Sequence, residues 1–255
     1  MRSRYLDIDD RTQDLAEQLR DEPSAAEEFL RRYELSWVYH ENALEGVVFS
    51  GEELAKALSG PPLTDIASLN ALRDVRNFKA AIDIVRLEAQ NRKPRITLAL
   101  VRKLYETLHA GIESRQVAEF RKEIPLHRAY FHEIAQPGRI AAQLDTLLEW
   151  TDSADYRGFH AVQKASRLQH GFMQIYPYTD GSGKIARLLS NLVLVSSGYQ
   201  PCIIHTIDRQ RYYESLKLPE SALRELMIES MENGIASGEK FMREARRQRY
   251  ARAAR

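Results

Sequence analysis

Apolar residues recur at helical spacing along most of this chain, whereas the alternation expected of a surface strand is nearly absent. The segment 65–91 shows the pattern most clearly, because its apolar residues form a single stripe: Ile66, Leu69, Leu72, Val75, Phe78, Ile82 and Val85. Such spacing gathers apolar side chains on one face of a helix. The sequence therefore predicts an all-α fold, with helices near 10–20, 24–46, 50–59, 65–91, 97–112, 140–151, 159–174, 185–197, 208–216 and 220–249.

The helical pattern fails between residues 114 and 138, where Pro125 and Pro137 interrupt the chain. Proline removes a backbone donor and ends helices, so we expect an irregular segment with a short hairpin here. No linker is long enough to separate two domains. Within this single unit we distinguish N-terminal helices (1–60), a core (61–218) and a C-terminal helical extension (219–255).

The composition is that of an ordinary folded protein, with 44% hydrophobic and 29% charged residues among 255. A formal net charge of +1 gives no bulk field for nucleic acid, and we interpret the arginines of 243–255 as a solvated helix end. No stretch approaches the ~18 consecutive apolar residues of a membrane span. The single cysteine, Cys202, lies in an apolar run, which indicates a packed thiol in a reducing compartment. We predict a cytoplasmic protein that binds neither nucleic acid nor a membrane.

The segment DGSGK at 180–184 lies between two predicted helices. Its glycines permit a tight backbone that turns amide groups toward an anion, and the next helix adds the positive end of its dipole. Lys184 and Arg187 lie three residues apart on one face of that helix and can neutralise phosphates. Asp180 is a hard oxygen ligand suited to Mg²⁺. The segment predicts a nucleotide-phosphate cradle, with a surface loop and an ordinary helix cap as the alternative.

The wider run YPYTDGSGKIAR at 176–187 resembles the signature of the Fic family. That signature reads His-Pro-Phe, any residue, Asp or Glu, Gly-Asn-Gly, Arg or Lys, two residues, Arg. Phe120-Arg121 resembles the element before the family's flap, Gly198-Tyr199 and 208–216 resemble its tail, and the likeness covers roughly 35–218. The resemblance implies a Fic-fold helical bundle with a short hairpin-like flap. It also implies transfer of AMP from ATP, with Mg²⁺, onto a hydroxyl of an unknown target protein, and often a homodimer.

The resemblance also assigns the residues of the site. The catalytic positions are Tyr176, Asp180, Lys184 and Arg187, and Asp180 is the metal ligand. The nucleotide-binding positions are Gly181, Ser182, Gly183, Lys184, Arg187, Asn191 and Tyr213, the last two facing the nucleoside.

Upstream, the segment YHENALEG at 39–46 resembles the family's inhibitory helix, written Ser or Thr, three residues, Glu, Gly. Glu45 and Gly46 match its end, and the resemblance implies that Glu45 pairs with Arg187 and obstructs the seating of the ATP γ-phosphate. Glu41 stands where the family has serine or threonine. The alternative for Glu45 is a helix-end carboxylate that faces solvent.

Three residues depart from the family signature, Tyr176, Tyr178 and Ser182, and the change of phenylalanine to Tyr178 is conservative. Tyr176 replaces the histidine that acts as general base, and a phenol with an ordinary pKa near 10 accepts a proton poorly at neutral pH. General-base help is worth typically ~10²–10⁴-fold in rate. Ser182 replaces asparagine and shortens the reach to phosphate, while Lys184 keeps the charge of arginine without its fork. The spacing of His127, His132 and His170 assigns none of them the missing role.

These departures leave three hypotheses about function, and they do not decide whether the protein is an enzyme. The first is a divergent transferase that binds ATP and Mg²⁺ and moves AMP, or another phosphate-linked group, onto a protein hydroxyl. The second is an inactive pseudoenzyme that acts through nucleotide or partner binding. The third is a hydrolase that removes AMP, with Glu45 orienting water.

Overall fold

The computed structural model describes residues 2–59, 66–112, 117–126 and 132–253, and within these ranges it contains helices but no strand. The helices are α1 (Arg2–Asp21), α2 (Pro23–Leu44), α3 (Gly51–Ser59), α4 (Ile66–Ala89), α5 (Leu98–Leu108), α6 (Ile140–Thr151), α7 (Ala154–Gly158), α8 (Ala161–Ile175), α9 (Ser182–Ser196), α10 (Arg209–Ser215) and α11 (Glu220–Ala253). Short 3₁₀ turns, Pro137–Arg139 and Thr206–Asp208, precede α6 and α10. The all-α prediction is confirmed.

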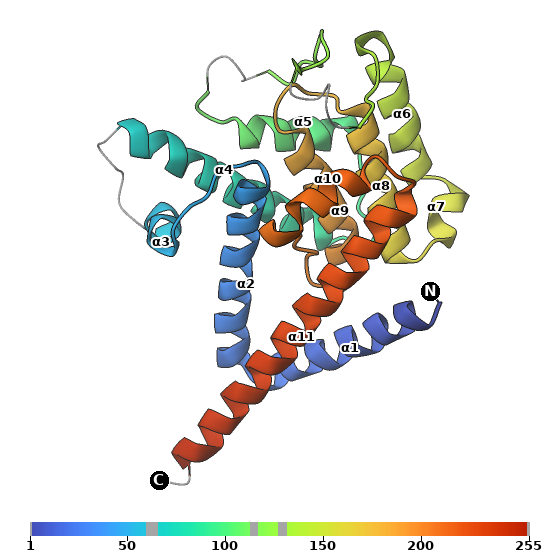
Figure 1. Cartoon of the computed structure of the whole chain (residues 1–255). Helices are drawn as coiled ribbons and strands as arrows, with labels where there is room; N and C mark the ends of the chain where they lie inside the picture. The colour runs from blue at the N-terminus through green and yellow to red at the C-terminus, as the bar shows by residue number, and fades with distance from the viewer. Residues whose placement is uncertain (1, 60–65, 113–116, 127–131, 254–255) are drawn as a thin grey trace.

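Helices α8 and α9 form the centre of the molecule (Figure 1). Helices α4 and α5 pack on α9, while α6 and α11 pack on α8. Between Ser182 and Leu194 every residue of α9 except Lys184 is buried. The burial of apolar side chains on all sides fixes this helix in place, and with it the loop that precedes it.

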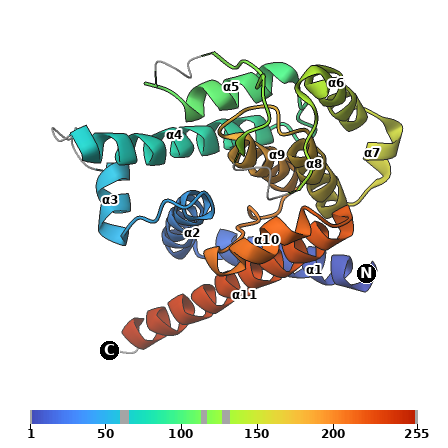
Figure 2. The same ribbon diagram turned by 45° about the horizontal axis from the view of Figure 1, so that its top comes forward.

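The N-terminal and C-terminal helices pack against this centre and against each other. Helix α1 runs along α11 (Figure 2), where Arg11 Nε lies 3.0 Å from Glu239 Oε1 and Arg4 Nη2 lies 2.8 Å from Glu232 Oε2. Helix α2 contacts α1, α4 and α11. The division of the chain at residues 60 and 218 remains a prediction, because these helices share one hydrophobic core with the middle of the chain.

The irregular segment after α5 differs in part from the expected hairpin. Its described residues, 117–126 and 132–136, form no strand, and 127–131, with His127, lie outside the described residues. Each arm instead bonds near the end of α8: the Ala135 amide donates to the Gln174 carbonyl in its last turn, and the Arg121 amide to the Pro177 carbonyl just after it, both at 2.9 Å. We call 117–126 the flap segment.

Two smaller expectations have clear outcomes. The helix predicted from 159 to 174 is α8, which begins at Ala161 because His160 caps it with a side chain that accepts from the Val162 amide. The short helix α7, which precedes the predicted range, was not predicted. Cys202 is a packed thiol as expected, and burial raises its pKa to about 12. No helix in the described part of the chain is long and apolar enough to cross a membrane.

Candidate functional site

The loop 176–181 joins α8 to α9, and its first residue, Tyr176, has a left-handed backbone with φ of 48° and ψ of 64°. Left-handed backbone costs a non-glycine residue roughly 1–2 kcal/mol. The Tyr176 amide donates to the Phe172 carbonyl at 2.8 Å, and its carbonyl accepts from Arg121 Nε at 2.7 Å. Contacts on both sides of the peptide therefore offset the strain. The Tyr176 side chain is buried.

Arg121 is the residue that ties the flap segment to this loop. Besides Tyr176, its guanidinium donates to the carbonyls of Ile175 at 3.3 Å, Glu123 at 3.0 Å and Ala135. The side chain is buried, so these carbonyls satisfy a guanidinium that water does not reach. The sequence placed Arg121 beside the flap without a contact, and the structure supplies its contacts.

The middle of the loop is anchored by Tyr178 and Ser182. The Tyr178 ring is fully buried, with its centroid 4.3 Å from that of Tyr105, as expected for a hydrophobic anchor. The Ser182 hydroxyl accepts from the Tyr178 amide at 2.9 Å and donates to the Tyr178 carbonyl at 2.8 Å. Because this hydroxyl is buried within the loop, only the backbone amide of Ser182 can serve the predicted contact with phosphate.

His109 packs against Gly181, a contact that the sequence did not reveal. Gly181 has a φ of 78°, and a Cβ there would lie 2.8 Å from His109 Cε1. His109 Nδ1 donates to the Tyr105 carbonyl at 2.8 Å, which fixes the ring. Glycine is therefore required at 181 for its backbone conformation and for the close approach of this ring.

The first turns of α9 present Arg187 to two carboxylates of α2. Arg187 is 2% exposed; its Nε donates to Glu41 Oε2 and its Nη2 to Glu45 Oε1, each at 2.7 Å, and its Nη1 donates to the Tyr212 hydroxyl at 3.3 Å. Burial alone lowers the pKa of Arg187, but Glu41, Tyr212 and Glu45 hold it well above its usual range. The expected contact between Glu45 and Arg187 is present.

Glu41 is the carboxylate that the sequence missed, since its position reads only as a departure from serine. Its side chain is 3% exposed, compared with 31% for Glu45. Burial raises the pKa of the Glu41 carboxyl, and contact with Arg187 opposes that shift. A spacing of four residues puts Glu41 and Glu45 on one face of α2, and this spacing was the signal available in the sequence.

Glu45 also lies over the first turn of α9. A Cβ on Gly183 would lie 2.7 Å from Glu45 Oε1, so glycine permits this carboxylate to approach the helix. The first amides of a helix lack intrahelical acceptors and carry the positive end of its dipole. A carboxylate of the chain therefore occupies the position that suits an anion.

Lys184 completes this group of charges. Its Nζ donates to Asn42 Oδ1 at 3.0 Å. Burial lowers its pKa, and the Glu45 carboxylate opposes that shift. Lys184 and Arg187 are thus brought together as predicted, and both contact α2.

The two residues expected at the nucleoside, Asn191 and Tyr213, both make hydrogen bonds within the chain. Asn191 uses both ends of its amide on Cys202, donating to its carbonyl at 3.2 Å and accepting from its amide at 2.7 Å. The Asn191 side chain therefore fixes the loop after α9, and its contact with the nucleoside stays a prediction. Tyr213 stays near the site, and its hydroxyl donates to the Leu44 carbonyl at 3.2 Å, as does Arg209 Nε at 2.8 Å.

Asp180 fits the predicted role of metal ligand only with help from a bound nucleotide. It is half-buried and directly precedes the glycine that caps α9. No cluster of three His, Cys, Asp or Glu side chains suited to a metal occurs among the described residues. Magnesium is commonly held by one or two carboxylates together with substrate phosphates, and Asp180 suits that arrangement.

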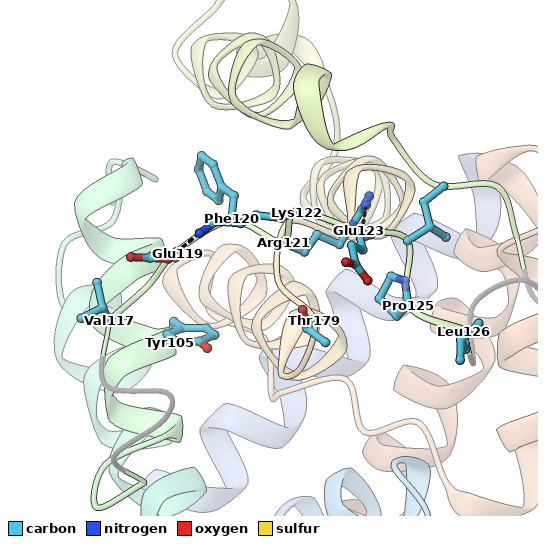
Figure 3. A pocket seen from close by; sticks show the side chains of 11 residues that line it. Tyr105, Val117, Glu119, Phe120, Arg121, Lys122, Glu123, Pro125, Leu126 and Thr179 are labelled. Atoms are coloured by element: carbon cyan, nitrogen blue, oxygen red, sulfur yellow. Dashed lines mark hydrogen bonds and ion pairs between the residues drawn. The ribbon is translucent and has the colours of Figure 1, made fainter.

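A cavity of about 720 Å³ lies beside the loop (Figure 3). The flap segment lines it, together with Tyr105 of α5 and Thr179 of the loop. Val117 and Leu126 are 68% and 88% exposed there. The Nε2 atoms of His132 and His170 donate to backbone carbonyls, those of Met173 at 2.8 Å and Leu218 at 3.1 Å respectively.

Comparison with known proteins points to one family. The model of the Fic/DOC family matches residues 95–194. Protein adenylyltransferase Fic of Aedes aegypti is 25% identical over 71% of this chain and that of Drosophila virilis is 26% identical, but the chain spans only 36% and 37% of their lengths.

Solved structures agree on the fold. A Fic domain containing signaling protein from Bacteroides thetaiotaomicron has a TM-score of 0.74 at 21% identity, covering 90% of this chain and 97% of its own. Fic-1 of C. elegans has a TM-score of 0.77 at 20% identity, covering 97% and 73%. Residues 95–194 of the chain therefore match the Fic/DOC family model, and the chain has the fold of solved Fic-domain proteins.

Proposed function

We propose that this protein binds a magnesium-bound nucleotide at the N-terminus of α9 and transfers AMP from it to a hydroxyl of another protein. One observation carries the proposal: two carboxylates of α2 contact Arg187, and one of them lies over the first turn of α9. Carboxylate and phosphate oxygens use the same donors. The chain thus binds its own anions where the phosphates of a nucleotide would lie.

The named relatives support this activity. The matched proteins of Aedes aegypti and Drosophila virilis are called protein adenylyltransferases. A further neighbour, IbpAFic2, was solved in complex with adenylylated Cdc42 and has a TM-score of 0.51. A protein acceptor for this chain is consistent with both names, and the exposed apolar side chains of the flap segment offer it a contact surface.

The residues of the loop divide the work of binding and positioning. The amides of Gly181, Ser182 and Gly183 and the side chains of Lys184 and Arg187 bind phosphate oxygens. Asp180 would hold Mg²⁺, which neutralises phosphate charge when it is bound. The acceptor oxygen then bonds to the α-phosphorus as the bond to the bridging oxygen breaks, and the hydroxyl proton passes to solvent. The part of the nucleotide beyond that oxygen leaves, as pyrophosphate from a triphosphate or as phosphate or its ester from a donor with a diphosphate linkage.

Glu45 regulates this site by competing with the nucleotide. While Glu45 lies on Arg187 and Gly183, its carboxylate occupies donors that the phosphates need, so it must withdraw before a triphosphate is seated. The side chain is 31% exposed and belongs to the residue that ends α2. Gly46, with a φ of 92°, follows it. An exposed side chain at a helix end can move without disturbing the core.

A second candidate function is nucleotide binding without catalysis. Tyr176 favours it, because its side chain is buried and its backbone is held by Arg121. A phenol in this position can donate a hydrogen bond but is a weak general base. Under the first candidate, positioning and electrostatic stabilisation remain without this base, so the rate of AMP transfer is reduced rather than abolished.

Incubation of the whole chain with α-³²P-ATP and Mg²⁺, with and without a cell lysate, tests the proposal. We expect weak labelling of a protein by the native chain, stronger labelling after Glu45→Gly, and none after Asp180→Ala. Labelling only after Tyr176→His would establish the binding protein without catalysis. Release of AMP from a labelled protein would identify a hydrolase, and no labelling by any variant would refute the transferase.

A further inference from the structure

Glu41 and Glu45 contact the same guanidinium but differ in their freedom to leave it. Glu41 lies within α2, one turn before its end, and its side chain is 3% exposed. The end of the helix is fixed at Leu44, whose carbonyl accepts from Arg209 and Tyr213. Glu45 lies just beyond this fixed point. Withdrawal of Glu45 therefore leaves Glu41 in contact with Arg187.

The contact with Glu41 limits what Arg187 can offer a phosphate. The Nε and one Nη of arginine form the fork that binds two oxygens of an anion at once. In this chain Glu41 binds Nε and Glu45 binds Nη2. When Glu45 withdraws, Nη2 becomes available but Nε does not, so the full fork is not restored.

The charge balance has the same consequence. Lys184 and Arg187 contribute two positive charges, and Glu41 and Glu45 two negative charges, so the group is neutral while Glu45 is bound. Withdrawal of Glu45 leaves a net charge of +1. Lys184 presents a single ammonium rather than a fork. Each added phosphate of a nucleotide brings further negative charge. The net charge of +1 on Lys184, Arg187 and Glu41 compensates little of it.

Resting on the proposed nucleotide site, we propose that Glu41 is a specificity-determining residue that disfavours triphosphates, so that the preferred donor is a nucleoside diphosphate or a nucleotide with a diphosphate linkage. Glu41 keeps a carboxylate on Arg187 throughout the reaction cycle. The loss of binding affinity concerns the distal phosphate of a triphosphate, because that phosphate depends on Arg187. A diphosphate can be bound by the loop amides and Lys184 with fewer contacts to Arg187.

Calorimetric titration of the whole chain with ADP and ATP, each with Mg²⁺, tests this inference. The background is Glu45→Gly, to which Glu41→Gln or Glu41→Ser is added; two replacements guard against failure of one to fold. We expect the single variant to bind ATP no more tightly than ADP. Removal of Glu41 is expected to raise ATP affinity about tenfold, and ADP affinity less than about threefold, as befits one charged contact.

The control is Glu52→Gln in the same background, which removes an exposed carboxylate of α3 that pairs with Lys56. It is expected to leave the ratio of the two affinities unchanged. If removal of Glu41 also left that ratio unchanged while both nucleotides bound, the role of Glu41 would be refuted and the nucleotide site retained. Absence of binding by every variant would refute the nucleotide site itself, and the inference with it.

Discussion

The two carboxylates on Arg187 should contribute unequally to stability, and the substitutions Glu41→Gln and Glu45→Gln test this. Both preserve shape and remove one negative charge. Breaking a buried ion pair by changing one partner costs about 3–5 kcal/mol. Arg187 retains Glu45 after Glu41→Gln, so we expect a loss of about 2–3 kcal/mol. Glu45 is 31% exposed, and solvent screening reduces the loss for Glu45→Gln to less than about 1 kcal/mol.

Thermal unfolding followed by circular dichroism measures the difference. In a chain of this size 1 kcal/mol corresponds to roughly 2–4 °C, so Glu41→Gln should lower Tm by about 5–10 °C and Glu45→Gln by less than about 4 °C. Glu52→Gln controls for loss of an exposed glutamate, whose side chain is 78% exposed. Urea unfolding gives an independent value of the free energy.

Equal losses for the two substitutions, or a larger loss for Glu45→Gln, would refute the reasoning. An unchanged Tm after Glu41→Gln would show that Arg187 does not depend on the charge of Glu41. Either outcome would also remove the basis for treating Glu41 as fixed and Glu45 as mobile.

Three further predictions concern other contacts. Burial, with a stacked His205 adding to it, lowers the pKa of His40 to about 4. The neutral His40 ring therefore contributes fully to stability above pH ~6.5, and this contribution is lost as the pH falls toward 4. His40→Gln should reduce the fall in unfolding free energy over this range, measured by urea titrations at several pH values. The reduction should be no more than roughly 1–2 kcal/mol, because the ring is partly exposed. Arg121→Met should cost about 3–5 kcal/mol in unfolding free energy, since it strands the buried carbonyls that Arg121 satisfies; a loss below 1 kcal/mol would contradict that role. Asn191→Ala should cost about 1–3 kcal/mol through the Cys202 contacts, yet leave ADP affinity unchanged in calorimetry; a tenfold weaker affinity would return Asn191 to the site.

The helical architecture could be predicted from the sequence because periodic burial is a local property of the chain. The apolar residues of α9 indicated a core helix, and 182–194 is buried as expected apart from Lys184. Helix α7 was missed because its five residues, Ala154–Gly158, are too few to show an apolar period.

The residues of the site that belong to a sequence motif could be predicted, whereas those that the fold brings in from other segments could not. Lys184, Arg187 and Glu45 were expected together and lie together. His109 and Arg121 reach the loop from elsewhere in the chain, and no local pattern reports such contacts. The contacts of Asn191 with Cys202 were missed because a motif gives the position of a residue, whereas its hydrogen bonds depend on which loop packs beside it.

The backbone contacts at Tyr176 also determine what its replacement can show. The left-handed conformation is fixed by the Phe172 carbonyl and by Arg121, both of which bind main-chain atoms of Tyr176. A side-chain substitution leaves these contacts available, and the glycine amides and Arg187 lie on α9, downstream of the change. Tyr176→His should therefore add an imidazole to a loop whose backbone is already set. A gain in labelling by that variant would reflect proton transfer rather than a rebuilt cradle, provided that its nucleotide affinity matches that of the native chain.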